Sequence, residues 1–493
     1  MRHWVIRCGL IGLVVNGPGV LAGPDGASAA GRRPNAEIAK ERVDRLERAV
    51  AAQQEKIDAL EQRVEQRSAA PADAVRVEEI QRVVAELMAD AEFREGLYPD
   101  VVQVGYDEGF YIKSSDEAFL LDITGMMQVR WIGTNRQTDT PWLPGRQKQD
   151  DINGFEVQYL VLNFDGYLHD PRLTYLVSVI GDTDQAHSWE TYYAQVNYEV
   201  AEELVVSAGI LDLPQGYNAL TADHKQLFVD RSLAAETFGL CCSIGVAISG
   251  LLFDKLEYAV GVVNGVGNGA DSPSQDGELD TNFAYAASLI YHLLGDGVAD
   301  DETDLPCSKA PLWDVGINAA YNDDNGDGDS TFFYSIPDRI RGGRGIGGYA
   351  EADLTGTDYC QFGADTAFRY RGFSFTAEWY LRTIDGDSEF SDWELLTGRS
   401  DAMHYQGGYV QAGYFIIPRK LEAAARMGGI WDANGDNTWE YTFGVNYYPY
   451  QSHSFKIQAD FTRIEEVPAS SPNGNWFQND ETGMFRVAVQ AAF

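Results

Sequence analysis

The stretch FSFTAEWYLR, residues Phe373–Arg382, alternates strictly between apolar and polar side chains. One parity carries Phe373, Phe375, Ala377, Trp379 and Leu381, and the other carries Ser374, Thr376, Glu378, Tyr380 and Arg382. A period of two places successive side chains on opposite faces of a β-strand. Two ionisable groups on one face require water, whereas a tryptophan and two phenylalanines on the other favour an apolar surrounding. The stretch predicts a strand that separates water from an apolar phase.

The same alternation recurs to the end of the chain in segments of about ten residues, separated by Gly, Asn, Asp and Pro. Sixteen strands are predicted, at 119–133, 154–167, 172–181, 188–200, 204–213, 242–252, 255–264, 281–294, 312–322, 358–370, 373–383, 404–416, 420–430, 438–448, 454–464 and 482–493. An even number brings both ends of a closed sheet to the same side of a membrane. We expect that side to be the periplasm.

Two features favour a transmembrane barrel over a soluble sandwich. Aromatic residues stand at the ends of the apolar faces, as an aromatic girdle requires: Trp131, Trp439, Tyr447 and Phe493. Charged residues stand on the polar faces and need water inside the sheet: Arg130, Glu378, Arg382, Arg426, Lys456 and Asp460. A sheet in hydrocarbon cannot keep open edges. The predicted fold is an all-β, 16-stranded antiparallel transmembrane β-barrel, preceded by an N-terminal α-helical coiled coil.

The N-terminal part divides into three predicted segments. Residues 1–29 have the basic start, apolar run and small residues of a signal peptide, with cleavage after Ala22 or Ala29 equally suitable. A coiled coil is predicted within 30–70, where apolar residues recur in steps of three and four from Val43 to Val64; a lone amphipathic helix is the alternative. Residues 71–104 form a helical linker, and the barrel occupies 105–493.

The connections between predicted strands alternate between short turns and long loops. Short turns are expected to face the periplasm and long loops the exterior. The acidic connection 295–311 is long where a short turn is expected, and the scheme does not explain it.

Composition limits the functions open to the chain. The formal net charge is −38, and beyond residue 100 acidic residues outnumber basic ones by 58 to 23. Nucleic acid is therefore excluded as a partner. The cysteines Cys241, Cys242, Cys307 and Cys360 lack metal-ligand spacing and are expected to be packed thiols.

The region from about 105 to 493 resembles the phosphate-selective porin O and P family of trimeric outer-membrane porins. The resemblance rests on FLLDITGMMQVRW (119–131), FVDRSL (228–233), TFGVNYYPYQSHSFKIQADFTRI (442–464) and the terminal Phe493. It implies that FVDRSL belongs to a third loop folded into the pore, with Asp230 at the position of the family's glutamate. It also implies an outer-membrane location, lipid contact, assembly as a homotrimer and passive diffusion of anions such as phosphate.

The ion preference stays open at this stage, because the family's constriction arginines correspond here to Gln158, Tyr159 and Val161. The acidic excess predicts a local enrichment of cations instead. Loop residues that could still make a local anion path are Lys225, Arg231, Arg339, Arg341 and Arg344. The predicted pore and constriction residues are Arg130, Gln158, His224, Lys225, Asp230, Arg231, Glu378, Arg382, Arg426 and Lys456.

The sequence also allows three other interpretations. The acidic residues Asp323, Asn325, Asp327 and Asp329 resemble half of a calcium loop, but Tyr334 stands at its twelfth position, so plain turns are favoured and no metal or other cofactor is expected. An outer-membrane enzyme would have only His224 and His404 as default candidates, so no catalytic residue is predicted. Finally, the coiled coil could bind cell wall and make the chain a structural tether.

Overall fold

A computed structural model describes residues 102–138, 153–181, 189–265, 283–323, 357–386, 403–432, 437–465 and 480–493, except 108, 241 and 299. The predicted signal peptide, coiled coil and most of the linker lie outside the described residues. So do Asn325, Asp327, Asp329, Cys241 and the loop arginines Arg339, Arg341 and Arg344. The predicted domain boundaries therefore stay predictions.

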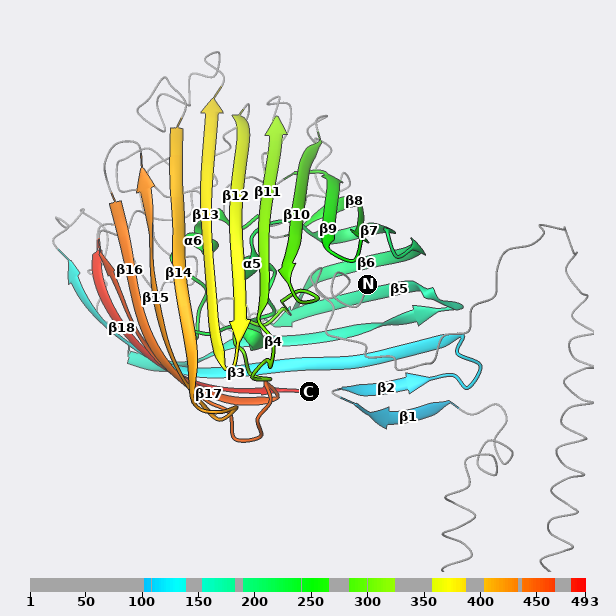
Figure 1. The fold of residues 1–493 in the computed structure, drawn as a ribbon, viewed down its shortest axis with the longest axis horizontal. Coiled ribbons are helices and arrows are strands. Elements are labelled where there is room, and N and C mark those ends of the chain that lie inside the picture. The colour runs from blue at the N-terminus through cyan, green and yellow to red at the C-terminus, as the bar shows by residue number, and fades with distance from the viewer. Residues whose placement is uncertain are drawn as a thin grey trace, which may run out of the picture. The chain divides into compact units, whose positions relative to one another are not determined.

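Eighteen strands of the described residues form one sheet (Figure 1). They are β1 (Gln103–Tyr106), β2 (Phe110–Lys113), β3 (Phe119–Thr138), β4 (Asn153–Leu168), β5 (Asp170–Gly181), β6 (Trp189–Ala201), β7 (Leu204–Asp212), β8 (Cys242–Leu252), β9 (Leu256–Val263), β10 (Ala284–Leu294), β11 (Leu312–Asp323), β12 (Thr357–Tyr370), β13 (Phe373–Gly386), β14 (Met403–Ile417), β15 (Leu421–Asp432), β16 (Asn437–Tyr447), β17 (Phe455–Glu465) and β18 (Asp480–Ala492).

Sixteen of these strands, β3–β18, close into a barrel. Each pairs antiparallel with the next along the chain, and β18 returns to pair with β3 from Asp480↔Thr138 to Ala492↔Met126. This confirms the predicted 16-stranded antiparallel barrel, and each predicted strand coincides with an observed one to within a few residues. Closure leaves the sixteen strands without the free edge that hydrocarbon forbids.

A short hairpin, β1–β2, was not predicted. β2 pairs with the start of β3, from Phe110↔Ile123 to Lys113↔Leu120, just beyond the point where β18 ends. The backbone of Phe493 exchanges two hydrogen bonds with Gly125, of 2.8 and 2.9 Å, and its ring lies edge-on to Phe110 at 5.9 Å. β18 and β2 therefore pair with successive parts of the same edge of β3. The hairpin β1–β2 covers the part of that edge that β18 does not reach.

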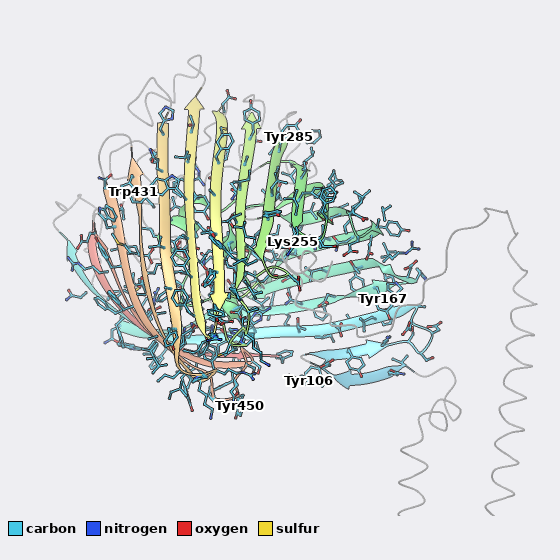
Figure 2. The ribbon with its side chains drawn as sticks, in the orientation of Figure 1. Tyr106, Tyr167, Lys255, Tyr285, Trp431 and Tyr450 are labelled. Carbon is cyan, nitrogen blue, oxygen red and sulfur yellow. The ribbon has the colours of Figure 1, made fainter. Side chains whose placement is uncertain are left out.

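The barrel is apolar outside and polar inside. On β13 the outward residues Trp379 and Leu381 are 44% and 45% exposed, whereas the inward Glu378 and Arg382 are 3% and 2% exposed. Aromatic side chains stand toward both ends of the wall: Figure 2 shows Tyr285 and Trp431 at one end and Tyr450 at the other. This distribution matches the apolar band and aromatic girdles of a barrel in a bilayer. Among the described residues, no helix has the length and apolar content to span a membrane.

The two ends of the barrel differ in their connections. One end is here called the turn end, because the strands are joined there by short connections. These range from one residue (169) to seven residues (448–454), and the connection 295–311 is the exception. At the opposite end, the described connection is the third loop, residues 213–241, which contains α5 (Tyr217–Leu220), a 3₁₀ turn at Asp223–Lys225 and α6 (Leu233–Phe238). The third loop is largely buried, and so is the central part of 295–311, whereas both ends of that connection are exposed.

The seam between β18 and β3 gives a test of closure. A methyl group added at Gly125 would lie 2.8 Å from Cζ of Phe493 and 3.0 Å from the carbonyl oxygen of Val161. We expect Gly125→Ala to destabilise the folded barrel by about 1–3 kcal/mol, because the crowded seam has to shift. The measurement is the temperature at which the folded band is lost on an SDS gel. Gly154→Ala is the matched control, because a Cβ there would meet nothing within 4 Å; equal effects of the two variants would contradict the prediction.

Candidate channel constriction

The third loop folds into the barrel and packs against its inner wall. Leu227, Phe228 and Phe238 are at most 2% exposed, although the loop belongs to no sheet. The ring of Phe238 stacks on Tyr380 of β13 with centroids 5.3 Å apart and planes at 2°. A Cβ at Gly407 of β14 would overlap the Phe238 ring, so a larger residue there would displace the loop. The labels of α5 and α6 in Figure 1 mark this loop among the strands.

α6 begins at a capped N-terminus within the FVDRSL motif. The Ser232 side chain accepts a hydrogen bond of 2.9 Å from the backbone N–H of Ala235. Such a cap satisfies one of the N–H groups that a helix start leaves without a partner. The motif predicted for the third loop therefore contains the cap of α6 and two adjacent charged residues, Asp230 and Arg231.

Basic side chains of the wall hold backbone carbonyls of the third loop. Lys456 of β17 donates to the carbonyls of His224 (3.0 Å) and Gln226 (2.9 Å). Arg426 of β15 donates to the carbonyls of Asp230 and Arg231, each at 3.2 Å. Both side chains are at most 3% exposed. A charged donor makes a stronger hydrogen bond than a neutral one, so these contacts fix the loop firmly.

Acidic side chains of the wall hold backbone N–H groups of the same loop. Asp460 accepts from Val229 N at 3.0 Å, and Glu440 accepts from Leu233 N at 2.8 Å. Glu378 accepts from the backbone N–H of Asn218. The loop backbone lacks strand partners. Acidic wall residues therefore accept hydrogen bonds from its N–H groups, and basic wall residues donate hydrogen bonds to its carbonyls.

Asp230 lies at the centre of a cluster of ion pairs that joins the third loop to β3, β4, β17 and β18. It pairs with Arg130 of β3 at 2.7 Å and with Arg486 of β18. Arg486 in turn pairs with Asp460 at 2.7 Å, and Arg130 with Glu156 of β4. Burial works to raise the pKa of Asp230, but the surrounding arginines outweigh it and hold the pKa below its usual range. Asp230 is therefore an ionised anchor of the loop.

The Arg231 side chain bonds to other residues of the third loop. Its guanidinium donates to the carbonyls of Asn218 and of Thr221 (3.0 Å) and pairs with Asp223 at 2.7 Å. Its side chain is 20% exposed. Arg231 therefore ties the two halves of the third loop together and keeps partial access to water.

All ten residues predicted for the pore lie on the inner side of the wall or in the third loop. The contacts described above show that five of them join the third loop to the wall: Arg130, Asp230, Arg426, Lys456 and Glu378. Gln158 donates to Asp230 at 3.4 Å. Arg382 donates to Gln361 at 2.8 Å and lies over the Phe238 ring at 4.7 Å. His224 and Lys225 belong to the 3₁₀ turn, where burial and nearby cations lower the pKa of His224 well below its usual value.

Most of these charges are covered. The basic wall residues that contact the third loop or the 295–311 segment are between 0% and 3% exposed: Arg130, Arg369, Arg382, Arg426, Lys456 and Arg486. Four of them, Arg130, Arg382, Arg426 and Lys456, are among the predicted pore residues; their observed contacts are with protein groups. His404, the other default candidate of an enzyme, lies on the outer face of β14, where it contacts Thr383 at 3.0 Å.

Five important residues were not predicted: Arg369, Glu440, Arg486, Asp301 and Glu302. The first three lie on inward positions of strands, and the alternation of Arg486 with apolar neighbours was a usable signal. Asp460 was predicted to face the lumen but was not included among the constriction residues. Asp301 and Glu302 belong to 295–311, for which the strand pattern offered no interpretation. No group of three or more His, Cys, Asp or Glu residues suited to a metal occurs in the described part of the chain.

Residues 315–475 match the phosphate-selective porin O and P family. The match confirms the family resemblance over about a third of the chain, within its C-terminal half, and the chain is an outer-membrane porin. No curated protein matches the chain as a whole.

The porin also resembles solved structures in fold. An anion-selective porin from Comamonas acidovorans superposes with a TM-score of 0.51 at 9% identity, covering 76% of this chain and 99% of that one. Two others are OmpF of Salmonella typhi (TM-score 0.47, 13% identity, 79% and 100% covered) and the outer membrane channel DcaP of Acinetobacter baumannii (0.45, 11%, 77% and 99%). The first of these likenesses shows that the porin barrel fold is shared.

Removing the carboxylate of Asp230 should loosen the third loop. Asp230→Ala leaves Arg130 and Arg486 buried without their shared partner, which costs about 3–5 kcal/mol for a buried pair. We expect a lower unfolding temperature of the barrel and noisier single-channel current in a planar bilayer. Asp296→Ala, which removes an exposed carboxylate at the turn end, serves as the control. Wild-type noise and stability in Asp230→Ala would contradict the anchoring role.

Glu236 of α6 should make the channel pH-dependent. Burial, with the nearby carboxylates of Asp230 and Glu440, raises the pKa of Glu236 to about 8. Because the folded pKa lies above the ordinary value of about 4.3, this group favours the folded loop at low pH, and that contribution is lost as pH rises to about 8. We expect the reversal potential in a salt gradient to shift toward cation preference as pH passes about 8. The shift should be absent in Glu236→Gln; its persistence there would assign it to another group.

Proposed function

We propose that this outer-membrane porin passes small hydrophilic solutes by passive diffusion, with a preference for cations. The observation that carries the cation preference is the burial of the basic wall residues beneath the third loop and the 295–311 segment. Their charges are engaged by carboxylates and backbone carbonyls, as Arg486 is by Asp230 and Asp460. A solute in the lumen then meets a chain with a large acidic excess.

Anion passage is the second candidate, and it has its own support. The matching family is described as phosphate-selective, and the superposed Comamonas porin is described as anion-selective. Within the third loop, Lys225 and Arg231 keep partial exposure and could form a local path for anions. The two candidates share the barrel and the diffusion mechanism and differ in the sign of the charge that the constriction favours.

The mechanism involves no covalent step. The third loop reduces the bore of the barrel, and its bonded backbone keeps that bore constant. Charged groups at the constriction raise or lower the local concentration of ions of each sign. We further propose that three copies assemble in the membrane, as the family resemblance implies. The cell-wall tether has no support from the family match or the fold.

Ion preference can be measured directly. In a planar bilayer under a potassium chloride gradient, we expect single-channel steps and a reversal potential of the cation-selective sign. An anion-selective sign would favour the second candidate, and the absence of conductance would overturn the porin function. Arg231→Ala should change the reversal potential, because it removes one of the two partly exposed cations, Lys225 and Arg231, of the third loop. If reversal potential and conductance both stay unchanged, Arg231 does not belong to the constriction.

A further inference from the structure

The connection 295–311 is the exception among the turns at its end of the barrel. It contains seventeen residues, between Leu294 of β10 and Leu312 of β11, five of them acidic. An acidic connection of this length would ordinarily be a solvated surface loop. Here, however, Val298, Glu302 and Asp304 are each 1% exposed. Because acidic side chains are rarely this buried without partners, the contacts of the segment show what it does.

Glu302 joins the segment to the third loop. One carboxylate oxygen accepts from the backbone N–H of Leu227 at 2.7 Å, and the other accepts from the side-chain amide of Asn218. The backbone N–H of Glu302 donates to the carbonyl of Lys225 at 3.3 Å. A single residue thus contacts both the α5 part and the central part of the third loop.

Asp301 adds contacts to the third loop and to distant parts of the wall. Its carbonyl accepts from the Tyr217 hydroxyl (2.9 Å) and from Arg369 of β12 (2.7 Å). Its carboxylate pairs with His453, in the turn between β16 and β17, at 2.8 Å. Because β11 and β16 are separated by four intervening strands, the segment has to extend across the lumen to make this contact.

Asp304 fixes the far end of the segment. Its carboxylate accepts from the backbone N–H of Gly372, in the turn between β12 and β13, at 2.6 Å. The backbone N–H of Arg371 donates to the carbonyl of Ser308 at 3.0 Å. Leu305 packs with Phe415 and Tyr448, which belong to the neighbouring part of the wall. The segment is therefore attached at three places on the turn end besides its own strands.

We propose that residues 295–311 form a second constricting element, which crosses the lumen at the turn end, and that Glu302 is the residue through which it positions the third loop. The proposal rests on the diffusion-channel function above. The porin then has two lumen segments, one entering from each end, which meet where Glu302 contacts Asn218 and Leu227. The acidic side chains of the segment serve mainly to bond backbone N–H groups and a histidine.

The first experiment removes the second element. Residues 295–311 are replaced by Asn-Gly, a sequence suited to a tight two-residue turn between antiparallel strands. Folding is checked by the heat-modifiable band on an SDS gel. We expect a larger single-channel conductance, and we expect larger polyethylene glycols to enter the pore when graded sizes are added on the turn side. A folded variant with wild-type conductance and wild-type polymer exclusion would overturn the proposal.

The second experiment tests Glu302 by point substitution. Glu302→Ala should raise the open-channel noise and admit larger polymers from the turn side, because the third loop loses two acceptors. Glu302→Gln should have the smaller effect, since its amide oxygen can still accept from Leu227. Asp296→Ala removes the same charge from an exposed site of the same segment and should change neither property.

The outcomes separate this proposal from the one on which it rests. If Glu302→Ala behaves like Asp296→Ala while the wild-type protein conducts, the positioning role is wrong and the porin function stands. If the wild-type protein does not conduct, the porin function itself fails. A selective rise in noise and polymer access for Glu302→Ala supports the second constricting element.

Discussion

The bonding of the third loop's backbone is the constraint on which the rest of the channel depends. A loop inside a barrel has peptide groups that no neighbouring strand can satisfy, and a buried peptide group without a partner is costly. Lys456 and Arg426 supply donors to its carbonyls, while Asp460 and Glu440 supply acceptors to its N–H groups. Because charged groups make stronger hydrogen bonds, a small number of wall residues can hold an irregular segment.

The ion pairs of the wall are therefore better understood as supports than as a filter. Burying a charge is favourable only when partners compensate for the lost water. Asp230 meets this condition by accepting from two arginines that come from opposite ends of the barrel sequence, Arg130 and Arg486. The same closure of β18 on β3 that removes the edge of the sheet also brings these two arginines to one carboxylate. The ion pairs around Asp230 therefore link the closure of the barrel to the position of the third loop in its lumen.

Sequence periodicity predicted the strands closely because the period of two is a local property. Each outward face has to meet lipid and each inward face water, so the pattern is imposed residue by residue along β13 and its neighbours. The hairpin β1–β2 was missed because four-residue strands are too short to show a period. The 295–311 segment was missed because its acidic residues are bonded to groups distant in sequence, such as Leu227, Gly372 and His453.

The sequence by itself determined a closed, antiparallel barrel of sixteen strands with a polar interior, and its resemblance to a porin family implied which loop enters that interior. Only the tertiary structure decided which inward charges face water and which are covered. Alternation places Glu378 and Arg426 on the inner side of their strands, and the fold places each under the third loop, where it bonds the loop backbone. The physical reason is that alternation sets the side of the wall on which a residue lies, whereas its partners are set by contacts between segments more than a hundred residues apart.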